Sequence, residues 1–146
     1  MTLTDEELDR YARQIVLKEI GGAGQMRLKA ATVAVIGAGG IGSPVIQYLA
    51  AAGVGRLITI DDDAVERSNL QRQTLFASAE TGLSKAEAAA AAARRLNPNV
   101  DATALATRFN AANAAALLAG ADVVIDGCDN FPTRLAVADA ALATRI

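Results

Sequence analysis

The sequence has 146 residues, and its 14 Lys and Arg nearly balance its 16 Asp and Glu, which gives a formal net charge of −2. This length suits one domain with a real core, and the charge balance offers no basic surface for sequence-independent binding of nucleic acid or of an anionic membrane. The absence of His and the single Cys exclude His-activated nucleophiles, metal sites built from His or from several Cys, and an internal disulfide.

Targeting and membrane signals are not found in the sequence. No apolar run is long enough to cross a bilayer, and the N-terminus is charged where a signal peptide would be apolar. Aromatic residues make up only 3% of the chain, which argues against stacking platforms for single-stranded nucleic acid. We therefore expect a cytoplasmic protein with neither a membrane nor a nucleic acid as its partner.

The first 30 residues are expected to form a helical segment. Thr4 is a suitable N-cap for a helix with an acidic first turn, whose apolar side is formed by Leu8, Tyr11, Ile15 and Ile20. We expect this helix to end near Gly21-Gly22 and a short helical piece to follow around Gln25–Lys29.

Strands and helices then alternate over residues 31–146. Apolar, β-branched runs predict strands at Thr32–Ile36, Arg56–Ile60, Val100–Thr107 and Ala121–Asp126. Helices are expected at Ser43–Ala52, Leu83–Leu96, Ala111–Leu118 and Pro132–Arg145. Alternation with short connections implies an α/β, doubly wound, mostly parallel Rossmann-like sheet with helices on both faces, preceded by the N-terminal helix.

A glycine-rich turn, Gly37-Ala-Gly-Gly-Ile-Gly42, connects the first expected strand to a helix. Gly37, Gly39 and Gly42 match the dinucleotide-binding fingerprint, and Gly40 lies between them. Glycines allow a tight turn and close approach of the backbone to phosphate, and the helix N-terminus offers free N–H groups. A close-packed turn without a ligand is the alternative. The flanking strand and helix favour nucleotide binding.

Acidic residues follow the second expected strand as Asp61-Asp62-Asp63. Asp61 stands about 20 residues after the glycines, where an acidic side chain meets the ribose of a bound nucleotide. A solvated carboxylate is the alternative and suits Asp62 better. Asp63 is kept as a candidate nucleotide contact.

The polar segment Ser68-Asn-Leu-Gln-Arg-Gln73 places an amide and a guanidinium just after the ribose-binding position. Arg72 suits phosphate because its planar fork binds two oxygens, and Lys85 adds a point charge from the next helix. A solvated polar loop would explain either residue separately. Together with the glycine turn and Asp61, they favour a triphosphate.

Further polar residues follow the last expected strand, at the sheet edge where open α/β folds bind ligands. A carboxylate there, such as Asp126 or Asp129, could hold Mg²⁺ together with the phosphates. Alternatively, Asp126 is structural, and Asp129 or Asn130 caps the helix that follows. Cys128 is assigned no role, because a lone buried Cys is more often a packing residue and no His can activate it.

These residues resemble the ThiF/MoeB/HesA adenylyltransferases, bacterial relatives of ubiquitin-activating enzymes. The matching features run in order along nearly the whole chain: Arg10–Ile15, Gly37–Pro44, Ala51–Gly55, Asp61–Val65, Ser68–Gln73, Gly82 with Lys85, Leu96–Pro98 and Asp126–Asn130. No single motif is specific to the family, whereas the ordered set is.

The resemblance implies that the enzyme uses Mg-ATP to adenylate the C-terminal glycine carboxylate of a small ubiquitin-like sulfur-carrier protein, releasing pyrophosphate. By similarity, Gly40 and its neighbours contact the nucleotide, Asp61 binds the ribose and Asp129 holds magnesium. The phosphate end is engaged by Asn69, Arg72, Gln73 and Lys85. The expected catalytic residues are Arg13, Arg72, Lys85 and Asp129.

The family also implies a homodimer in which Arg13 reaches across a two-fold interface into the partner's ATP site. Its members continue well beyond this length, with a further strand, a carrier-binding region and often paired Cys-x-x-Cys zinc ligands. We therefore expect this sequence to be the ATP-binding front part of a longer enzyme, with zinc only in a downstream region.

Two other functions stay open from the residues. An NAD-dependent oxidoreductase would use the same glycine fingerprint, but Arg72, Lys85 and Asp129 would be superfluous there. A non-catalytic dimerisation subunit of an activating complex would keep the first helix, and the intact set of charged residues argues against it.

Overall fold

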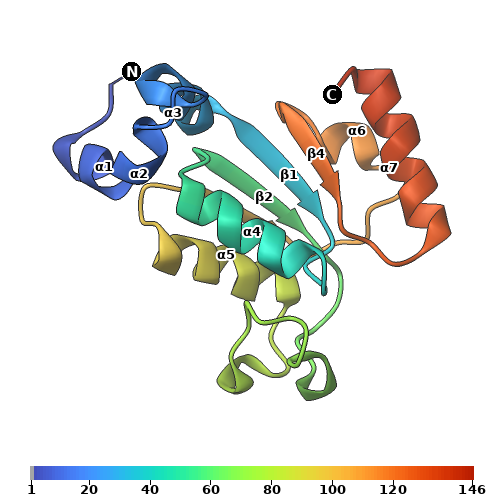
Figure 1. Cartoon of the computed structure of the whole chain (residues 1–146). Helices are drawn as coiled ribbons and strands as arrows, with labels where there is room; N and C mark the ends of the chain where they lie inside the picture. Colours follow the sequence, from blue (N-terminus) through green and yellow to red (C-terminus); the bar gives the residue numbers. More distant parts are fainter. Residues whose placement is uncertain (1) are drawn as a thin grey trace.

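The computed structural model describes residues 2–146, which form a four-stranded parallel sheet with helices on both sides (Figure 1). The strands are β1 (Thr32–Ile36), β2 (Arg56–Ile60), β3 (Asp101–Leu105) and β4 (Val123–Asp126). Their order is β3-β2-β1-β4, and all three neighbouring pairs are parallel. This confirms the predicted fold class. The order reverses at β1, so the carboxyl ends of β1 and β4 border the crevice where such sheets bind ligands.

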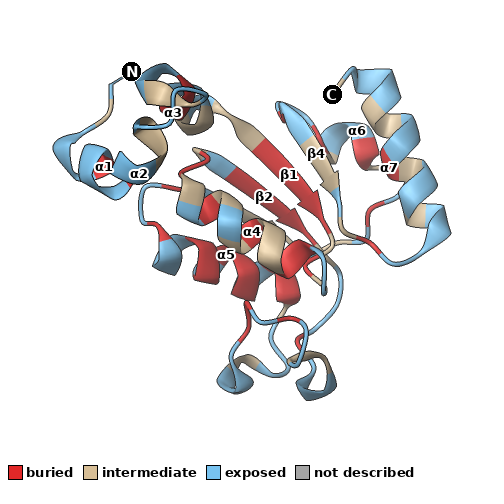
Figure 2. Cartoon of the chain, viewed as in Figure 1, coloured by how far each residue is buried: buried red, intermediate tan, exposed pale blue. Residues whose placement is uncertain are grey.

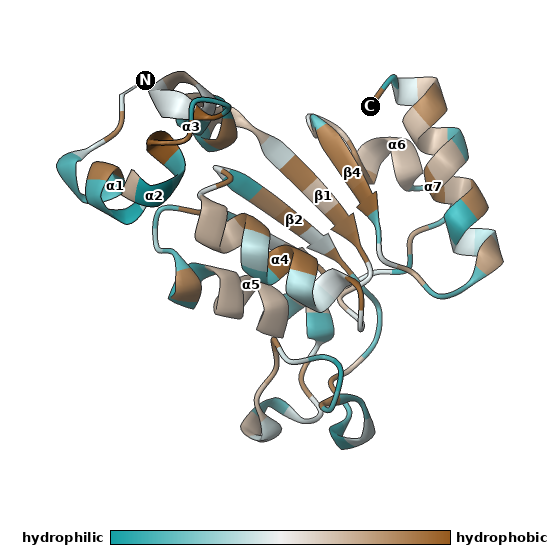
Figure 3. Ribbon diagram, in the orientation of Figure 1, coloured by the Kyte–Doolittle hydropathy of each residue, from teal (hydrophilic) through white to brown (hydrophobic). Residues whose placement is uncertain are grey.

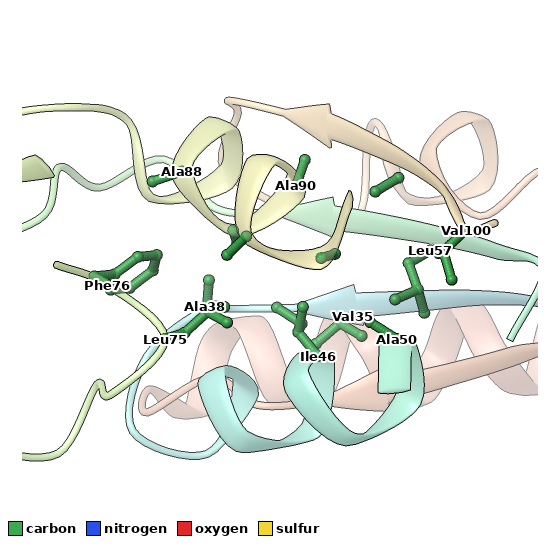
Figure 4. Close-up of a cluster of buried hydrophobic side chains, with 14 of the residues drawn as sticks. Val35, Ala38, Ile46, Ala50, Leu57, Leu75, Phe76, Ala88, Ala90 and Val100 are labelled. Atoms are coloured by element: carbon green, nitrogen blue, oxygen red, sulfur yellow. The ribbon is translucent and has the colours of Figure 1, made fainter. Parts of the chain in front are cut away.

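One face of the sheet is covered by α4 (Gly42–Ala52) and α5 (Lys85–Leu96). Val35 and Leu57 point to this side, where Ile46 of α4 is fully buried (Figure 4). The core side of α5 consists of alanines, whose small side chains let the helix lie close to both α4 and the sheet. This packing gives the glycine turn before α4 a rigid support.

The opposite face is covered by α6 (Ala114–Leu117) and α7 (Phe131–Thr144). Ile36 and Ile58 form a buried cluster on this side with Leu118 and Val137. Figure 2 shows β1 and β2 as mostly buried. Figure 3 shows hydrophobic residues along the strands and polar residues in the loops beyond their carboxyl ends. The sheet therefore has a core on each face and a polar edge.

The N-terminal segment differs in part from the prediction. The N-cap Thr4 and Glu7 form a capping box, which confirms the predicted helix start. The expected single helix is divided into α1 (Asp5–Arg10) and α2 (Ala12–Ile15), and α3 (Gly21–Ala30) begins at the glycines where an end was expected. Gly21, with a φ of 59°, lets the chain turn directly into α3. The expected apolar side is also wrong at Leu8, which is 45% exposed.

The remaining elements lie close to their predicted places. Ser84 caps α5 and Gly53 is the left-handed exit of α4, as expected. Helix α6 is shorter than predicted because Asn110 and Asn113 hydrogen-bond to each other and to nearby backbone instead of joining the helix. Two short 3₁₀ turns, Arg67–Asn69 and Ser78–Glu80, lie in the polar segment between β2 and α5. No helix within residues 2–146 is long and apolar enough to cross a bilayer.

Candidate functional site

A cleft of about 520 Å³ lies at the carboxyl ends of the strands. Ile36 and Ile60 end β1 and β2 at its floor, and the turn after β4 forms one wall. The predicted residues that line it are Gly37, Gly39, Gly40, Asp61, Asp63, Arg72, Gln73, Lys85, Asp129 and Asn130. Residues far apart in the sequence thus meet at one edge because the strands are parallel.

The four glycines of the turn have two different roles. A Cβ at Gly42 would lie 1.8 Å from the carbonyl oxygen of Gly37, and one at Gly37, where φ is 87°, would lie 3.0 Å from the carbonyl oxygen of Gly127. Packing therefore requires glycine at these two positions, as expected for a close-packed turn. Gly42 does not line the cleft. The nearest atoms to a Cβ at Gly39 and Gly40 are instead side-chain atoms of Gln73 and Arg72, at 3.6 and 3.4 Å. Gly39 and Gly40 therefore keep the cleft open.

Asp61 connects the glycine turn to the loop after β2. Its carboxylate accepts hydrogen bonds from the backbone N–H of Ala38 at 2.7 Å and of Asp63 at 2.8 Å. Burial raises the pKa of Asp61 above its ordinary value, although the two N–H donors oppose this shift. The carboxylate is thereby fixed at the cleft with lone pairs left for a hydroxyl donor.

Two cationic side chains, Lys85 and Arg72, line the cleft and differ in burial and in hydrogen-bond partner. Lys85 is only 5% exposed, and its ammonium donates to a carboxylate oxygen of Asp63 at 2.9 Å. Arg72 is exposed and donates to the side-chain oxygen of Asn69 at 3.0 Å. Asp63 and Asn69 are thus partners of the two cations, and Asn69 does not itself line the cleft.

Gln73 provides an independent sign of a ligand. The side chain is 3% exposed, and its Oε1 atom has no hydrogen-bond partner among residues 2–146. A buried amide oxygen without a partner costs roughly 1–3 kcal/mol. Because Gln73 lines the cleft, a polar ligand there would remove that cost.

The turn after β4 presents Asp129 to the cleft. Asp126 accepts a hydrogen bond from the Cys128 backbone at 3.0 Å, which is the structural role considered for it. Asn130 caps α7 by accepting from the N–H of Thr133. Arg134 donates twice to the carbonyl of Cys128, at 3.0 and 3.3 Å. Hydrogen bonds of Asp126, Asn130 and Arg134 thus fix the turn that carries Asp129, whose side chain is exposed.

Cys128 is buried in that turn. Burial, followed by the neighbouring Asp126, raises the pKa of its thiol to about 11. The thiol is therefore protonated at neutral pH and is a poor nucleophile, in agreement with the sequence interpretation.

Three residues that line the cleft were not predicted from the sequence: Arg108 and Phe109, which follow β3, and Arg134 of α7. Arg108 lines the cleft and lies 3.3 Å from the carboxylate of Asp62, and Phe109 is buried beside it. A signal existed, because a segment that follows any parallel strand begins at the same edge. Arg134, four residues after the N-cap of α7, was available by the same argument.

Arg13 is the one expected catalytic residue outside the cleft. It is exposed on α2, and the neighbouring Gln14 hydrogen-bonds to the carbonyl of Ala52, the last residue of α4. Helix α4 begins beside the cleft at Gly42, and a helix of its length spans about 16 Å. Helix α2 lies at the C-terminal end of α4 (Figure 1), so Arg13 is at the far end of α4 from the cleft of its own chain.

Comparison with curated sequences finds close relatives. The chain is 50% identical over 139 residues to the SAMP-activating enzyme E1 of Haloferax volcanii, covering 95% of this chain and 52% of that protein. It is 50% identical over 142 residues to the sulfur carrier protein adenylyltransferase of Thermus thermophilus, covering 97% of this chain and 52% of that protein. It is 54% identical over 138 residues to mouse adenylyltransferase and sulfurtransferase MOCS3, covering 94% of this chain and 30% of that protein. The chain spans about half the length of the first two relatives.

Solved structures show the same fold. The Escherichia coli tRNA N6-threonylcarbamoyladenosine dehydratase TcdA, solved in complex with ATP, superposes with a TM-score of 0.93 at 27% identity, covering 100% of this chain and 60% of that chain. The model of the ThiF family matches residues 11–146, which include the whole cleft and Arg13. The chain therefore belongs to the ThiF family.

Proposed function

We propose that this chain is the ATP-binding part of an enzyme that adenylates the C-terminal glycine carboxylate of a small ubiquitin-like sulfur-carrier protein. The observation that carries the proposal is the convergence of Asp61, Arg72, Lys85 and Asp129 on one cleft behind a glycine turn. The names of the relatives from Haloferax volcanii and Thermus thermophilus support the carrier as the partner.

The chemistry needs no nucleophile from the enzyme. An oxygen of the carrier's terminal carboxylate attacks the α-phosphorus of ATP, the bond to the β-phosphate oxygen breaks, and pyrophosphate leaves with that bond's electron pair. Arg72 and Lys85 stand where they can stabilise the charge that develops on the phosphates. The lack of His and the protonated Cys128 thiol are compatible with this reaction.

The residues of the cleft also fit Mg²⁺, which prefers oxygen ligands. Of the other carboxylates that line the cleft, Asp61 is engaged by two N–H donors, Asp62 by Arg108 and Asp63 by Lys85. Asp129 is exposed beside the cleft and is our proposed magnesium ligand. The bound ion would neutralise charge on the phosphates and the departing pyrophosphate.

A dimer completes the proposed site. Arg13 cannot serve the cleft of its own chain, since it lies at the far end of α4, so we propose that it acts in the cleft of a second copy. Val16 and Leu17, which follow Arg13, are 76% and 49% exposed and would be covered in such a homodimer. The division into a dimer-forming segment 1–30 and an ATP-binding domain 31–146, a cytoplasmic location and a downstream zinc site are parts of the same proposal.

The alternative oxidoreductase would require NAD in this cleft. Arg72 and Lys85 favour a triphosphate instead, since both cations line the same cleft as the glycine turn and have no role in hydride transfer. A non-catalytic subunit is disfavoured because the charged residues of the cleft are all present and brought together.

Calorimetry with ATP·Mg, AMP and NAD tests the proposal. We expect ATP·Mg to bind more tightly than AMP, and NAD to bind at least about tenfold more weakly than ATP, because charge-assisted phosphate contacts contribute roughly 1.5–3 kcal/mol each. The full-length protein should then catalyse exchange of pyrophosphate into ATP when its carrier is present. Tighter binding of NAD than of ATP would overturn the proposal.

A further inference from the structure

Helix α2 is anchored on both sides of Arg13. Tyr11 precedes it, is 2% exposed, and accepts a hydrogen bond at its hydroxyl from Asn97 Nδ2 at 2.7 Å. The Tyr11 ring lies on Gly53, where a Cβ would come within 2.4 Å of the ring. Asn97 also donates to the carbonyl of Ala50, so the anchor is tied to the last turn of α4.

The second anchor follows Arg13. Gln14 Nε2 donates to Gln25 Oε1 at 2.6 Å and to the carbonyl of Ala52 at 3.1 Å. Gln25 is fully buried and donates to the same carbonyl at 2.9 Å. Both anchors thus bind the C-terminal end of α4, one two residues before Arg13 and one immediately after it.

A segment as short as α2 does not hold its own shape. Four helical residues are far fewer than an isolated helix needs, so its orientation depends on tertiary contacts. The two anchors are polar and directional, and burying them is costly unless every partner is satisfied. Attachment of the segment to the domain could be achieved by apolar packing alone. The hydrogen bonds in addition fix the orientation of the backbone at Arg13, which lies between Tyr11 and Gln14.

We propose that Tyr11 and Gln14 are positioning residues that hold the exposed Arg13 guanidinium in the direction required for the cleft of the neighbouring subunit. This inference rests on the proposed function, because it requires that Arg13 act in trans. A displacement of about 1 Å can cost a hundredfold in rate, so loosening either anchor reduces turnover and leaves ATP binding in the distant cleft unchanged.

The test uses Gln14→Met, which keeps the length of the side chain and removes its amide, in mixed dimers of the full-length protein assayed by pyrophosphate exchange. The reference mixture combines an Arg72→Ala chain with an Arg13→Ala chain and has one working site per mixed dimer. In the first test mixture Gln14→Met is added to the Arg72→Ala chain, which donates Arg13. In the second it is added to the Arg13→Ala chain, which donates Arg72.

We expect the first test mixture to lose at least about tenfold in turnover relative to the reference and the second to match the reference, with the KM for ATP unchanged within about twofold in both. Equal activity of the two test mixtures overturns the inference, because a merely structural defect is independent of which chain carries it. A reference mixture that is inactive although its subunits exchange shows instead that the proposed action in trans is wrong.

Tyr11→Phe gives an independent measurement, because it keeps the ring on Gly53 and removes only the hydroxyl that Asn97 contacts. In the same two placements it should reproduce the asymmetry found for Gln14→Met. Lys18→Met is the matched control, since Lys18 is exposed just beyond α2 and its ion pair within residues 2–146 is with the adjacent Glu19, at 3.9 Å. An asymmetry of similar size for Lys18→Met would contradict the assignment to the anchors.

Discussion

Asp63 lines the cleft, and its carboxylate already has a partner within the chain. The motif marks it as a nucleotide contact, whereas the structure pairs its carboxylate with the ammonium of Lys85 at 2.9 Å. Lys85 is 5% exposed and Asp63 is largely exposed. The ion pair therefore supplies a counter-charge to the buried ammonium of Lys85 at the cleft. A bound triphosphate and Asp63 would then compete for one ammonium.

Asp63→Asn tests that competition. The variant should melt at a lower temperature without ligand, because the buried ammonium loses its counter-charge. Its stabilisation by ATP should exceed that of the parent protein, since the phosphates then supply the missing charge. Thermal unfolding with and without ATP measures both quantities. Asp101→Asn is the control, because Asp101 is exposed, lies 3.6 Å from Arg56 and does not line the cleft. A smaller shift by ATP in Asp63→Asn would mean that Asp63 contacts the nucleotide directly.

The glycine turn allows a prediction at the scale of one element. Gly42→Ala places a Cβ 1.8 Å from the Gly37 carbonyl oxygen, whereas at Gly40 the nearest atom is Arg72 Cδ at 3.4 Å. Gly42→Ala should therefore lower the free energy of unfolding by at least about 2 kcal/mol. Gly40→Ala should fold with nearly unchanged stability and bind ATP more weakly, because its methyl group would occupy the space proposed for the phosphates.

Urea unfolding and calorimetry of the two variants separate these effects. If Gly40→Ala bound ATP as the parent does, the nucleotide would not approach this turn, and the fingerprint would be only a packing device. Equal stability of Gly42→Ala and the parent would contradict the distinction between the two kinds of glycine.

Helix α1 is attached to α3 through a pH-dependent contact. Glu7 is 3% exposed and accepts from Lys29 Nζ at 2.7 Å. The hydrogen bond from Lys29, followed by that from the Thr4 backbone, holds the pKa of Glu7 below its ordinary value of 4.5. A carboxyl group with a lowered pKa in the folded state stabilises the fold above its unfolded pKa, and this contribution is lost as the pH falls through the folded pKa.

Glu7→Gln should consequently melt roughly 5 °C below the parent at pH 7. The difference should shrink once the pH falls below about 4.5, because protonation of Glu7 in the parent removes the same contact. Glu6→Gln is the matched control, since Glu6 is exposed and its nearest cation, Arg10, lies 3.9 Å away. A difference that stayed constant over this pH range would refute the assignment of the effect to the Glu7 charge.

Features set by local sequence could be predicted, whereas features set by contacts between residues distant in the sequence could not. The strands were predictable because their apolar runs are local, and parallel pairing then placed Asp61 and Asp129 at one edge. The break between α1 and α2 was not, because it depends on Tyr11 packing on Gly53, which is distant in the sequence. Lys85 and Asp63 could be assigned to the site, but their pairing with each other could not.

Across the whole molecule, the cleft and Arg13 occupy opposite ends of α4. The proposed ATP-binding residues lie at the carboxyl edge of the sheet, whereas α1–α3 pack where β1 and β2 begin (Figure 1). A single chain therefore holds two parts of the proposed site that cannot meet within it. In the proposed homodimer the two parts would meet, so turnover would depend on assembly of the dimer and nucleotide binding would not.

Arg13→Ala and Arg72→Ala should separate these two properties. Arg72 lines the cleft, so its loss should weaken ATP binding about tenfold or more. Arg13 is remote from the cleft of its own chain, and in the proposed dimer its charge acts on the phosphates during attack. Its loss should reduce turnover at least about a hundredfold and change ATP affinity less than about twofold. Calorimetry and pyrophosphate exchange measure the two effects, with Arg95→Ala, an exposed position at the end of α5, as the control. An equal loss of ATP affinity in Arg13→Ala would show that Arg13 binds the nucleotide before the reaction, and the separation of binding from turnover would then be wrong.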